Sequence, residues 1–204
     1  MTTFTSQGQR LPLDSLVIKY NLDDNNLNNK VLQTIYSQKE HLKGMLKPSL
    51  KIPQSNIGGW LSKRNFHNWN EPGIKQLFNS FKDPITDYIN YMHTIHNMAT
   101  NNNYEWSHYS WVNFLPQYAY NAPHTHPGSQ ISGCYYFSTP LPNQEHPFSG
   151  RIDFIEDKVE TGLQPEKGTL LLFPSNLLHW VHPNYNAEDR ISLSLNIMSI
   201  KKIN

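Results

Sequence analysis

Three histidines are candidate metal ligands because of their spacing. His124 and His126 lie two residues apart between Pro123 and Pro127, and His179 closes a later apolar run. Side chains alternate along an extended strand, so His124 and His126 would share one face. If a barrel or sandwich brings His179 opposite them, three neutral imidazoles converge and leave coordination positions for water or substrate. The spacing therefore predicts an open metal site.

A strand that begins at Arg190 offers a second chemical feature. Polar residues alternate with apolar ones along it: Arg190, Ser192, Ser194 and Asn196 against Ile191, Leu193, Leu195 and Ile197. An arginine that points inward is costly unless it meets an anion, and its planar fork suits a carboxylate. Ser192 would lie on the same face and donate to that anion. The alternative is a structural ion pair with Asp153 or Glu156.

Composition limits the classes of protein that need be considered. The chain has 204 residues, of which 37% are hydrophobic, and a formal net charge of +1. Its length fits a single domain over residues 1–204. The near-zero charge, without blocks of one sign, argues against a nucleic-acid partner. One cysteine, no apolar run of membrane length and no export signal predict a soluble, cytoplasmic protein without a membrane partner.

Helices are expected in the first half of the chain and strands in the second. An edge strand is predicted at 16–20, a helix at about 27–43, and a further helical region from 72 to about 97, restarted by Pro84. From residue 104 short strand-like runs follow, at 104–115, 130–138, 150–156, 168–173, 177–182 and 190–200. The pattern is mainly β. It predicts a jelly roll at about 104–200, supported by helices at about 21–100.

These motifs together resemble the iron(II)- and 2-oxoglutarate-dependent dioxygenases, and most closely a bacterial and phage branch of oxygenases without assigned substrates. The resemblance covers roughly residues 50 to 198. It rests on the following set: Ser55-Asn56-x-Gly58-Gly59-Trp60-x-Ser62, Asn113, His124-x-His126, Ser132-Gly133-x-Tyr135-Tyr136, Gly168-x4-Phe173-Pro174-Ser175, His179 and Arg190-x-Ser192.

The resemblance implies a fold, cofactors and residue roles. The fold would be a double-stranded β-helix, with His124 and His179 as iron ligands. Arg190 and Ser192 would bind the distal carboxylate of 2-oxoglutarate. The reaction would use Fe(II), 2-oxoglutarate and O2, would release succinate, and would hydroxylate an unidentified protein side chain or small molecule. Four further residues would line the pocket or bind the cosubstrate: Asn113, Tyr118, Tyr135 and Asn196.

The sequence departs from the family pattern at His126. The first motif of these enzymes usually reads His-x-Asp or His-x-Glu, whereas a histidine occupies the second position here. Either His126 is the third ligand, or a carboxylate comes from Asp153 or Glu156, or water fills the position. A set of three histidines carries one negative charge less, which would alter iron affinity and redox tuning.

Two other functions fit parts of the sequence. A cupin-like metal enzyme without 2-oxoglutarate also uses His-x-His and a later histidine, but Gln130-Ile131-Ser132 stands where its acidic residue is expected. That function leaves Arg190 without a role. A non-catalytic jelly-roll module that binds a glycan through Trp and Tyr would need no metal.

Cys134 is predicted to pack in the core rather than act as a nucleophile.

Overall fold

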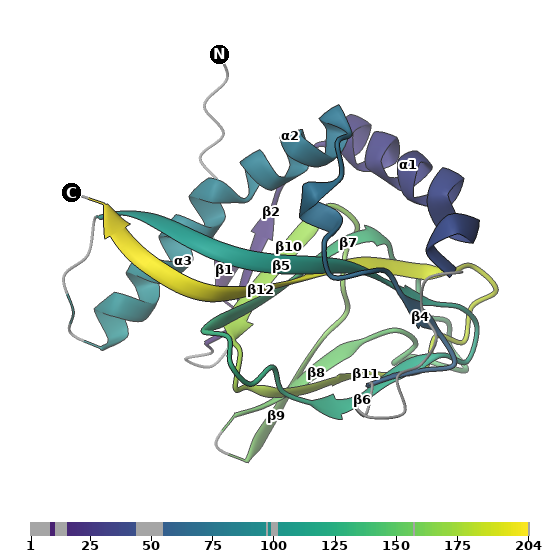
Figure 1. Ribbon diagram of the computed structural model, residues 1–204. Coiled ribbons are helices and arrows are strands. Elements are labelled where there is room, and N and C mark those ends of the chain that lie inside the picture. The colour runs from purple at the N-terminus through teal and green to yellow at the C-terminus, as the bar shows by residue number, and fades with distance from the viewer. Residues whose placement is uncertain are drawn as a thin grey trace.

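The computed structural model describes residues 9–10, 16–43, 55–96, 98, 102–156 and 158–203 (Figure 1). The helices are α1 (Asn25–Lys43), α2 (Pro72–Ser80) and α3 (Lys82–Ile95), with a 3-10 turn η1 (Phe66–Asn68) before α2. Within these ranges, no helix could span a membrane.

The strands of the described residues form two antiparallel sheets. The larger has the order β1 (Gln9–Arg10), β2 (Ile18–Asn21), β10 (Thr169–Pro174), β7 (Ile131–Ser138), β12 (Arg190–Ile203), β5 (Asn103–Leu115) and β4 (Trp60–Leu61). The smaller has the order β3 (Asn56–Ile57), β6 (Tyr120–His124), β11 (Leu178–Val181), β8 (Ile152–Glu156) and β9 (Val159–Leu163).

From β5 onward the chain winds between the two sheets. Strands β5, β7, β10 and β12 lie in the larger sheet, and β6, β8, β9 and β11 lie in the smaller one. Figure 1 shows the smaller sheet facing one side of the larger, with the helices on the other side. This winding is the arrangement of a double-stranded β-helix, and it confirms the predicted fold class.

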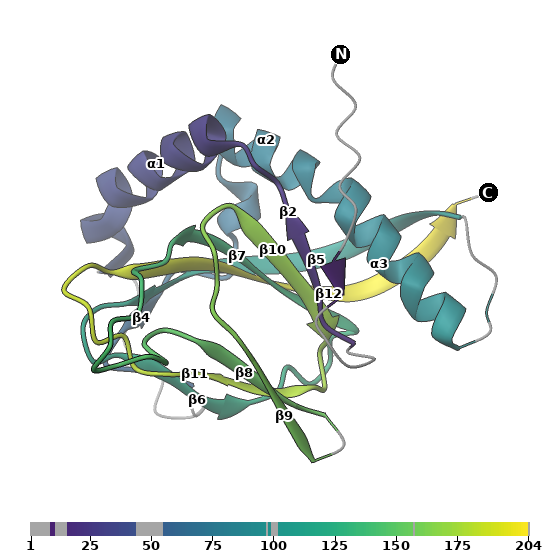
Figure 2. The same cartoon turned by 180° about the vertical axis from the view of Figure 1, so that it is seen from behind.

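The helices form the layer that supports the larger sheet (Figure 2). Asp24 Oδ1 accepts a hydrogen bond from the Leu27 backbone N–H at 2.8 Å and so caps the start of α1. Pro84 is the third residue of α3, where no helical N–H is lost, so the chain restarts a helix there as predicted. A continuous core joins the two layers, with Val31 and Ile35 of α1 among the residues packed with Phe114 and Leu193 of the sheet.

A second core fills the space between the sheets, and part of it is polar. Its apolar members include Leu115, Tyr136, Phe154 and Phe173. Side chains alternate between the two faces of β12. Ile191 and the apolar residues at every second position after it pack in the helix-facing core. Arg190, Ser192 and Ser194 face the interior between the sheets. The inside of the double-stranded β-helix therefore contains a polar cavity.

Strands β6 and β9 were not predicted, and each has a local reason. β9 is an exposed edge strand interrupted by Gly162, so it shows no regular apolar alternation. β6 contains Pro123 and ends at His124, so His126 lies just beyond the strand rather than on it. The runs at 168–173 and 177–182 are indeed strands, but they belong to different sheets, because the chain crosses between the sheets after Pro174.

Candidate metal and cosubstrate site

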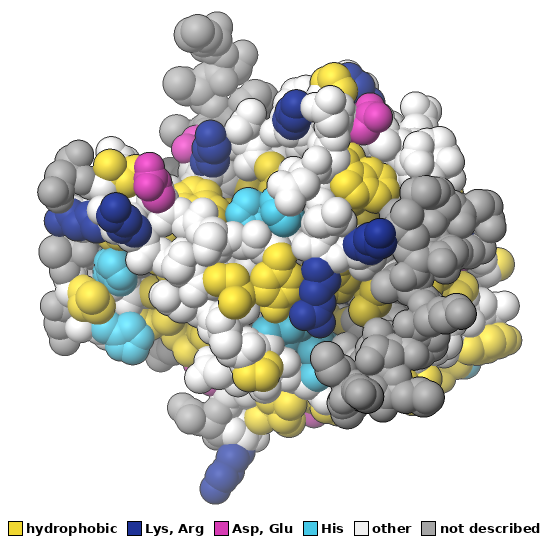
Figure 3. Space-filling view, viewed as in Figure 1, with side chains coloured by type: hydrophobic (Ala, Val, Ile, Leu, Met, Phe, Trp, Pro, Cys, Tyr) yellow, Lys and Arg dark blue, Asp and Glu magenta, His cyan; other side chains and the backbone are white. Residues whose placement is uncertain are grey.

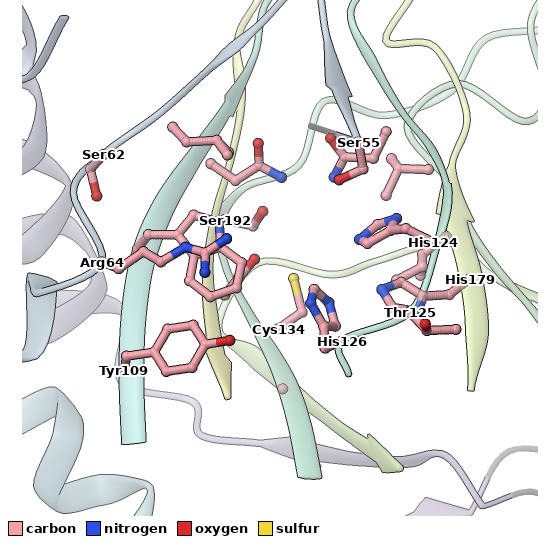
Figure 4. Close-up of a pocket in the computed structure, with 18 of the residues that line it drawn as sticks. Ser55, Ser62, Arg64, Tyr109, His124, Thr125, His126, Cys134, His179 and Ser192 are labelled. Atoms are coloured by element: carbon pink, nitrogen blue, oxygen red, sulfur yellow. The ribbon is translucent and has the colours of Figure 1, made fainter. Parts of the chain in front are cut away.

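The structure brings His124, His126 and His179 together. A ligand nitrogen from each lies within 4.8 Å of the others. The ring centroids of His124 and His179 are 4.3 Å apart, and those of His126 lie 5.0 Å from His124 and 5.1 Å from His179. Figure 4 shows the three side chains grouped on one wall of a cavity. The predicted convergence of the three histidines is present.

Two elements and one loop hold these histidines in place. His124 on β6 and His179 on β11 are direct partners in the antiparallel pairing of the smaller sheet. His126 follows β6 in a loop, and its backbone N–H donates to the Ser175 carbonyl oxygen at 2.7 Å. The Ser175 hydroxyl in turn donates to the Ser129 carbonyl oxygen. Ser175 therefore holds both ends of the His126–Ser129 turn through hydrogen bonds.

Hydrogen bonds fix the tautomers of two of the rings. His124 Nδ1 lies 2.7 Å from the Ala122 carbonyl oxygen, and His179 Nδ1 lies 2.8 Å from the Leu177 carbonyl oxygen. A carbonyl oxygen only accepts, so each Nδ1 carries the proton and each Nε2 keeps a free lone pair. That is the form in which imidazole binds a metal ion.

Burial keeps all three rings neutral. It lowers the pKa of His179 to about 3, with a further contribution from His124. It lowers the pKa of His126 to about 4, helped by His124 and Arg64, and it also lowers the pKa of His124. At neutral pH no proton has to leave before a cation binds. The donor set therefore fits a divalent metal ion.

The two alternative carboxylates are engaged elsewhere. Asp153 is a neighbour of Phe154, which pairs with His179, so its side chain points to the other face of the sheet. There it accepts from Arg151 Nε at 2.5 Å and contacts His182 Nε2. Glu156 accepts from the Leu16 backbone N–H at 3.4 Å. Neither belongs to the group of metal-ligating side chains that the structure brings together.

Arg190 lies in the same cavity as the histidines and is only 1% exposed. Its Nε donates to the Gly150 carbonyl oxygen at 3.0 Å and its Nη1 to Ser192 Oγ at 3.3 Å. Its Nη2 is buried without a partner, as is the hydroxyl of Tyr136, whose ring lies 5.1 Å from the guanidinium carbon. No carboxylate of the described residues pairs with it, so the alternative of a structural ion pair is wrong. A buried cation with an unused donor is suited to an anion.

The cavity that joins these groups has a volume of about 550 Å³, within the range of small-molecule sites. Asn113 lines it as predicted, and its Oδ1 accepts from Asn56 Nδ2 at 2.6 Å. Cys134 is buried and also borders the cavity, where burial raises the pKa of its thiol. The cavity thus contains both the candidate metal site and the candidate anion site.

Three predicted pocket residues do not line the cavity. Tyr135 points into the helix-facing core, where its hydroxyl donates to Asn28 Oδ1 at 3.0 Å, because alternation along β7 puts Tyr136 on the cavity side instead. Asn196 lies on the correct face of β12, but its carboxamide is bonded to Ser132 and Tyr109, each at 2.8 Å. Tyr118 is 66% exposed, in a turn outside the cavity.

Other residues that line the cavity were missed. Tyr109 and Trp111 stand on β5 in the same alternation as Asn113, which is a signal that the sequence did contain. Lys63 and Arg64 lie between β4 and η1, on a segment without strand or helix periodicity. Only the path of the chain in space brings that segment to the cavity.

Residues 109–196, which contain all three histidines and Arg190, match a family model described as "Putative 2OG-Fe(II) oxygenase". This segment is similar to the 2OG-Fe(II) oxygenase family. The suspected resemblance is thus confirmed, and the activity of the family is oxygenation that depends on iron(II) and 2-oxoglutarate. No curated protein sequence matches this oxygenase.

Solved structures of other oxygenases share its fold. A prolyl-4-hydroxylase from Pseudomonas putida has a TM-score of 0.62 at 15% identity, with 89% of this chain and 91% of that chain covered. A prolyl hydroxylase from Trichoplax adhaerens, in complex with a peptide fragment of hypoxia inducible factor, has a TM-score of 0.66 at 16% identity and coverages of 89% and 82%. A viral collagen prolyl hydroxylase from Paramecium Bursaria Chlorella virus-1 gives 0.58 at 16% identity and coverages of 90% and 96%. At such identities the likeness concerns the fold.

Proposed function

We propose that this oxygenase is a hydroxylase in which His124, His126 and His179 hold Fe(II) and Arg190 binds 2-oxoglutarate. The observation that carries the proposal is the buried Arg190 Nη2, which lacks a partner in the cavity that also receives the three histidines. A non-catalytic module has no use for such a pair of sites. A cupin-like enzyme without 2-oxoglutarate would leave the guanidinium unsatisfied.

The residues that line the cavity fit both Fe(II) and 2-oxoglutarate. Three neutral imidazoles are common ligands of ferrous iron and leave coordination positions open. The Arg190 fork, Ser192 Oγ and the unpaired Tyr136 hydroxyl together offer donors to a carboxylate. When bound, the metal and 2-oxoglutarate would supply oxygen activation coupled to the oxidative decarboxylation of 2-oxoglutarate to succinate.

The protein itself orients and shields the reacting groups. The backbone carbonyls of Ala122 and Leu177 hold the His124 and His179 rings through their Nδ1–H groups, which fixes the direction of each Nε2. Phe154 and Phe173 pack around His179, with ring centroids 5.9 and 4.9 Å from its own. These apolar rings limit the access of water to that side of the site.

The proposed prime substrate is a protein side chain or a small molecule. Peptide modification is supported by analogy with the structural neighbours that are prolyl hydroxylases, one of which was solved with a peptide. We also propose that residues 1–204 act as one catalytic domain in the cytoplasm. The free, buried Cys134 suits that compartment.

The test is anaerobic loading with Fe(II) followed by oxygen, with succinate formation from 2-oxoglutarate as the readout. We expect slow turnover without a prime substrate, and none for His179→Ala. A wild-type protein that binds neither metal nor 2-oxoglutarate would contradict the proposal. Metal binding without 2-oxoglutarate binding would favour the cupin-like alternative.

A further inference from the structure

The cavity is lined by cations and lacks acidic residues. Its described lining includes Lys63, Arg64 and Arg190, and contains neither aspartate nor glutamate. The candidate ligands are three neutral histidines, so no ligand carboxylate would offset the charge of a bound divalent ion. Arg190 is assigned to the cosubstrate under the proposed function, whereas Lys63 and Arg64 have no role in it. A positive cavity of this kind favours an anionic substrate over a cationic one.

Arg64 is placed to contact such a substrate. Its guanidinium carbon lies 5.3 Å from the ring centroid of Tyr109 and 5.4 Å from that of Trp111. The two rings are stacked, 5.6 Å apart at an interplanar angle of 18°. Contact with the rings occupies the face of the guanidinium and leaves the N–H groups at its edge available. No described residue forms a hydrogen bond or an ion pair with that edge.

The aromatic wall connects Arg64 to the metal site. Trp111 is 6% exposed and meets the His126 ring edge-on, with centroids 5.9 Å apart. Figure 4 shows Arg64 extending from its own segment into the cavity, with the histidines on the opposite side. In Figure 3 a Lys or Arg side chain lies beside hydrophobic and histidine side chains near the centre of the visible face. Arg64 is exposed, unlike Arg190, so a molecule from solvent can reach it.

We propose that Arg64, with Lys63 next to it, binds a carboxylate of the prime substrate against the wall formed by Tyr109 and Trp111. The planar fork of Arg64 matches a carboxylate through two parallel hydrogen bonds. The substrate class is therefore an acidic molecule or an acidic side chain whose reacting C–H group lies between Arg64 and the three histidines. This inference rests on the proposed function, because it assigns Arg190 to 2-oxoglutarate.

The test uses benzoate and benzamide as probes of equal shape and different charge. The protein is loaded with Zn(II), which does not turn over, and saturated with 2-oxoglutarate so that Arg190 is occupied. Ligand-observed saturation-transfer NMR then reports the binding of each probe. We expect benzoate to bind, benzamide to bind at least about tenfold more weakly, and Arg64→Gln to remove the preference, as loss of one charged hydrogen bond predicts.

Matched variants make the outcome specific. Lys82→Gln removes one positive charge from an exposed position on α3 and should keep the preference for benzoate, while Arg64→Lys should keep part of it. Absence of benzoate binding, equal binding of benzamide, or an unchanged preference in Arg64→Gln or in the Lys63→Gln/Arg64→Gln double variant would overturn the inference. Zinc and 2-oxoglutarate binding is measured on every sample. If the wild type fails to bind 2-oxoglutarate, the proposed function fails; if it binds 2-oxoglutarate but not benzoate, only the assignment of Arg64 fails.

Discussion

His124 and His179 face each other across the β6–β11 pair, and each directs Nδ1 to the carbonyl two residues before it in the chain. The antiparallel register thus builds two ligands with the same local geometry from two distant segments. The third, His126, comes from the loop that Ser175 holds in place. His126 occupies the position where enzymes of this family usually have a carboxylate.

Substitutions at His126 should distinguish a ligand from a neighbour. We expect His126→Ala to weaken Fe(II) or Zn(II) binding by at least about tenfold, because one of three donors is lost. His126→Asp should retain one metal ion per chain, since it restores the carboxylate that the family usually has. Metal content after dialysis and calorimetric titration measure both. Unchanged affinity in His126→Ala would remove His126 from the ligand set.

Arg190→Ala should weaken 2-oxoglutarate binding by about tenfold or more while the metal content stays at one ion per chain. The reason is that Arg190 Nη2 has no hydrogen-bond partner and is free to bind the cosubstrate. Arg190 is not one of the metal-ligating side chains. Calorimetric titration of the Zn(II)-loaded variant is the measurement. Loss of metal in this variant would instead mean that Arg190 maintains the structure of the site.

Tyr136→Phe should separate ligand binding from stability. The Tyr136 hydroxyl is fully buried beside Arg190 and Cys134 without a well-aligned hydrogen bond, so its removal should change the melting temperature of the metal-free protein little. The same change should weaken 2-oxoglutarate binding by about tenfold if that hydroxyl donates to the cosubstrate. Tyr135→Phe is the matched control. It loses the bond to Asn28, so it should lower the melting temperature and leave 2-oxoglutarate affinity unaltered.

His108 should make stability depend on pH independently of the metal site. It lies on the helix-facing side of β5, its Nε2 is buried without a partner, and burial together with His67 lowers its pKa to about 4. Between pH 6.5 and about 4 the unfolded chain therefore binds a proton that the folded protein does not. The free energy of unfolding should fall as the pH is lowered through this range. Denaturant titrations of His108→Phe and wild type, both compared in metal-free form, should show a shallower pH dependence in the variant. An identical slope would exclude His108 as a cause.

Residue types and spacing alone led to the predicted chemistry of the site. The types and spacing of His124, His126, His179 and Arg190 predicted a metal site beside an anion site, and the alternation along β12 predicted which residues face inward. Local rules sufficed there, because a strand with one polar and one apolar face has a single way to bury itself. The same holds for the helix that restarts near Pro84.

The choice among the candidate residues required the arrangement of the strands in the folded chain. Asp153 and Glu156 stood as plausible ligands until the pairing of β8 with β11 turned Asp153 to the other face. The register of β7 placed Tyr136 rather than Tyr135 beside Arg190, because a shift of one residue exchanges the two faces of a strand. Arg64 reached the cavity through a loop with no periodic pattern. Contacts between segments far apart in the chain depend on how whole sheets pack, and no local spacing encodes them.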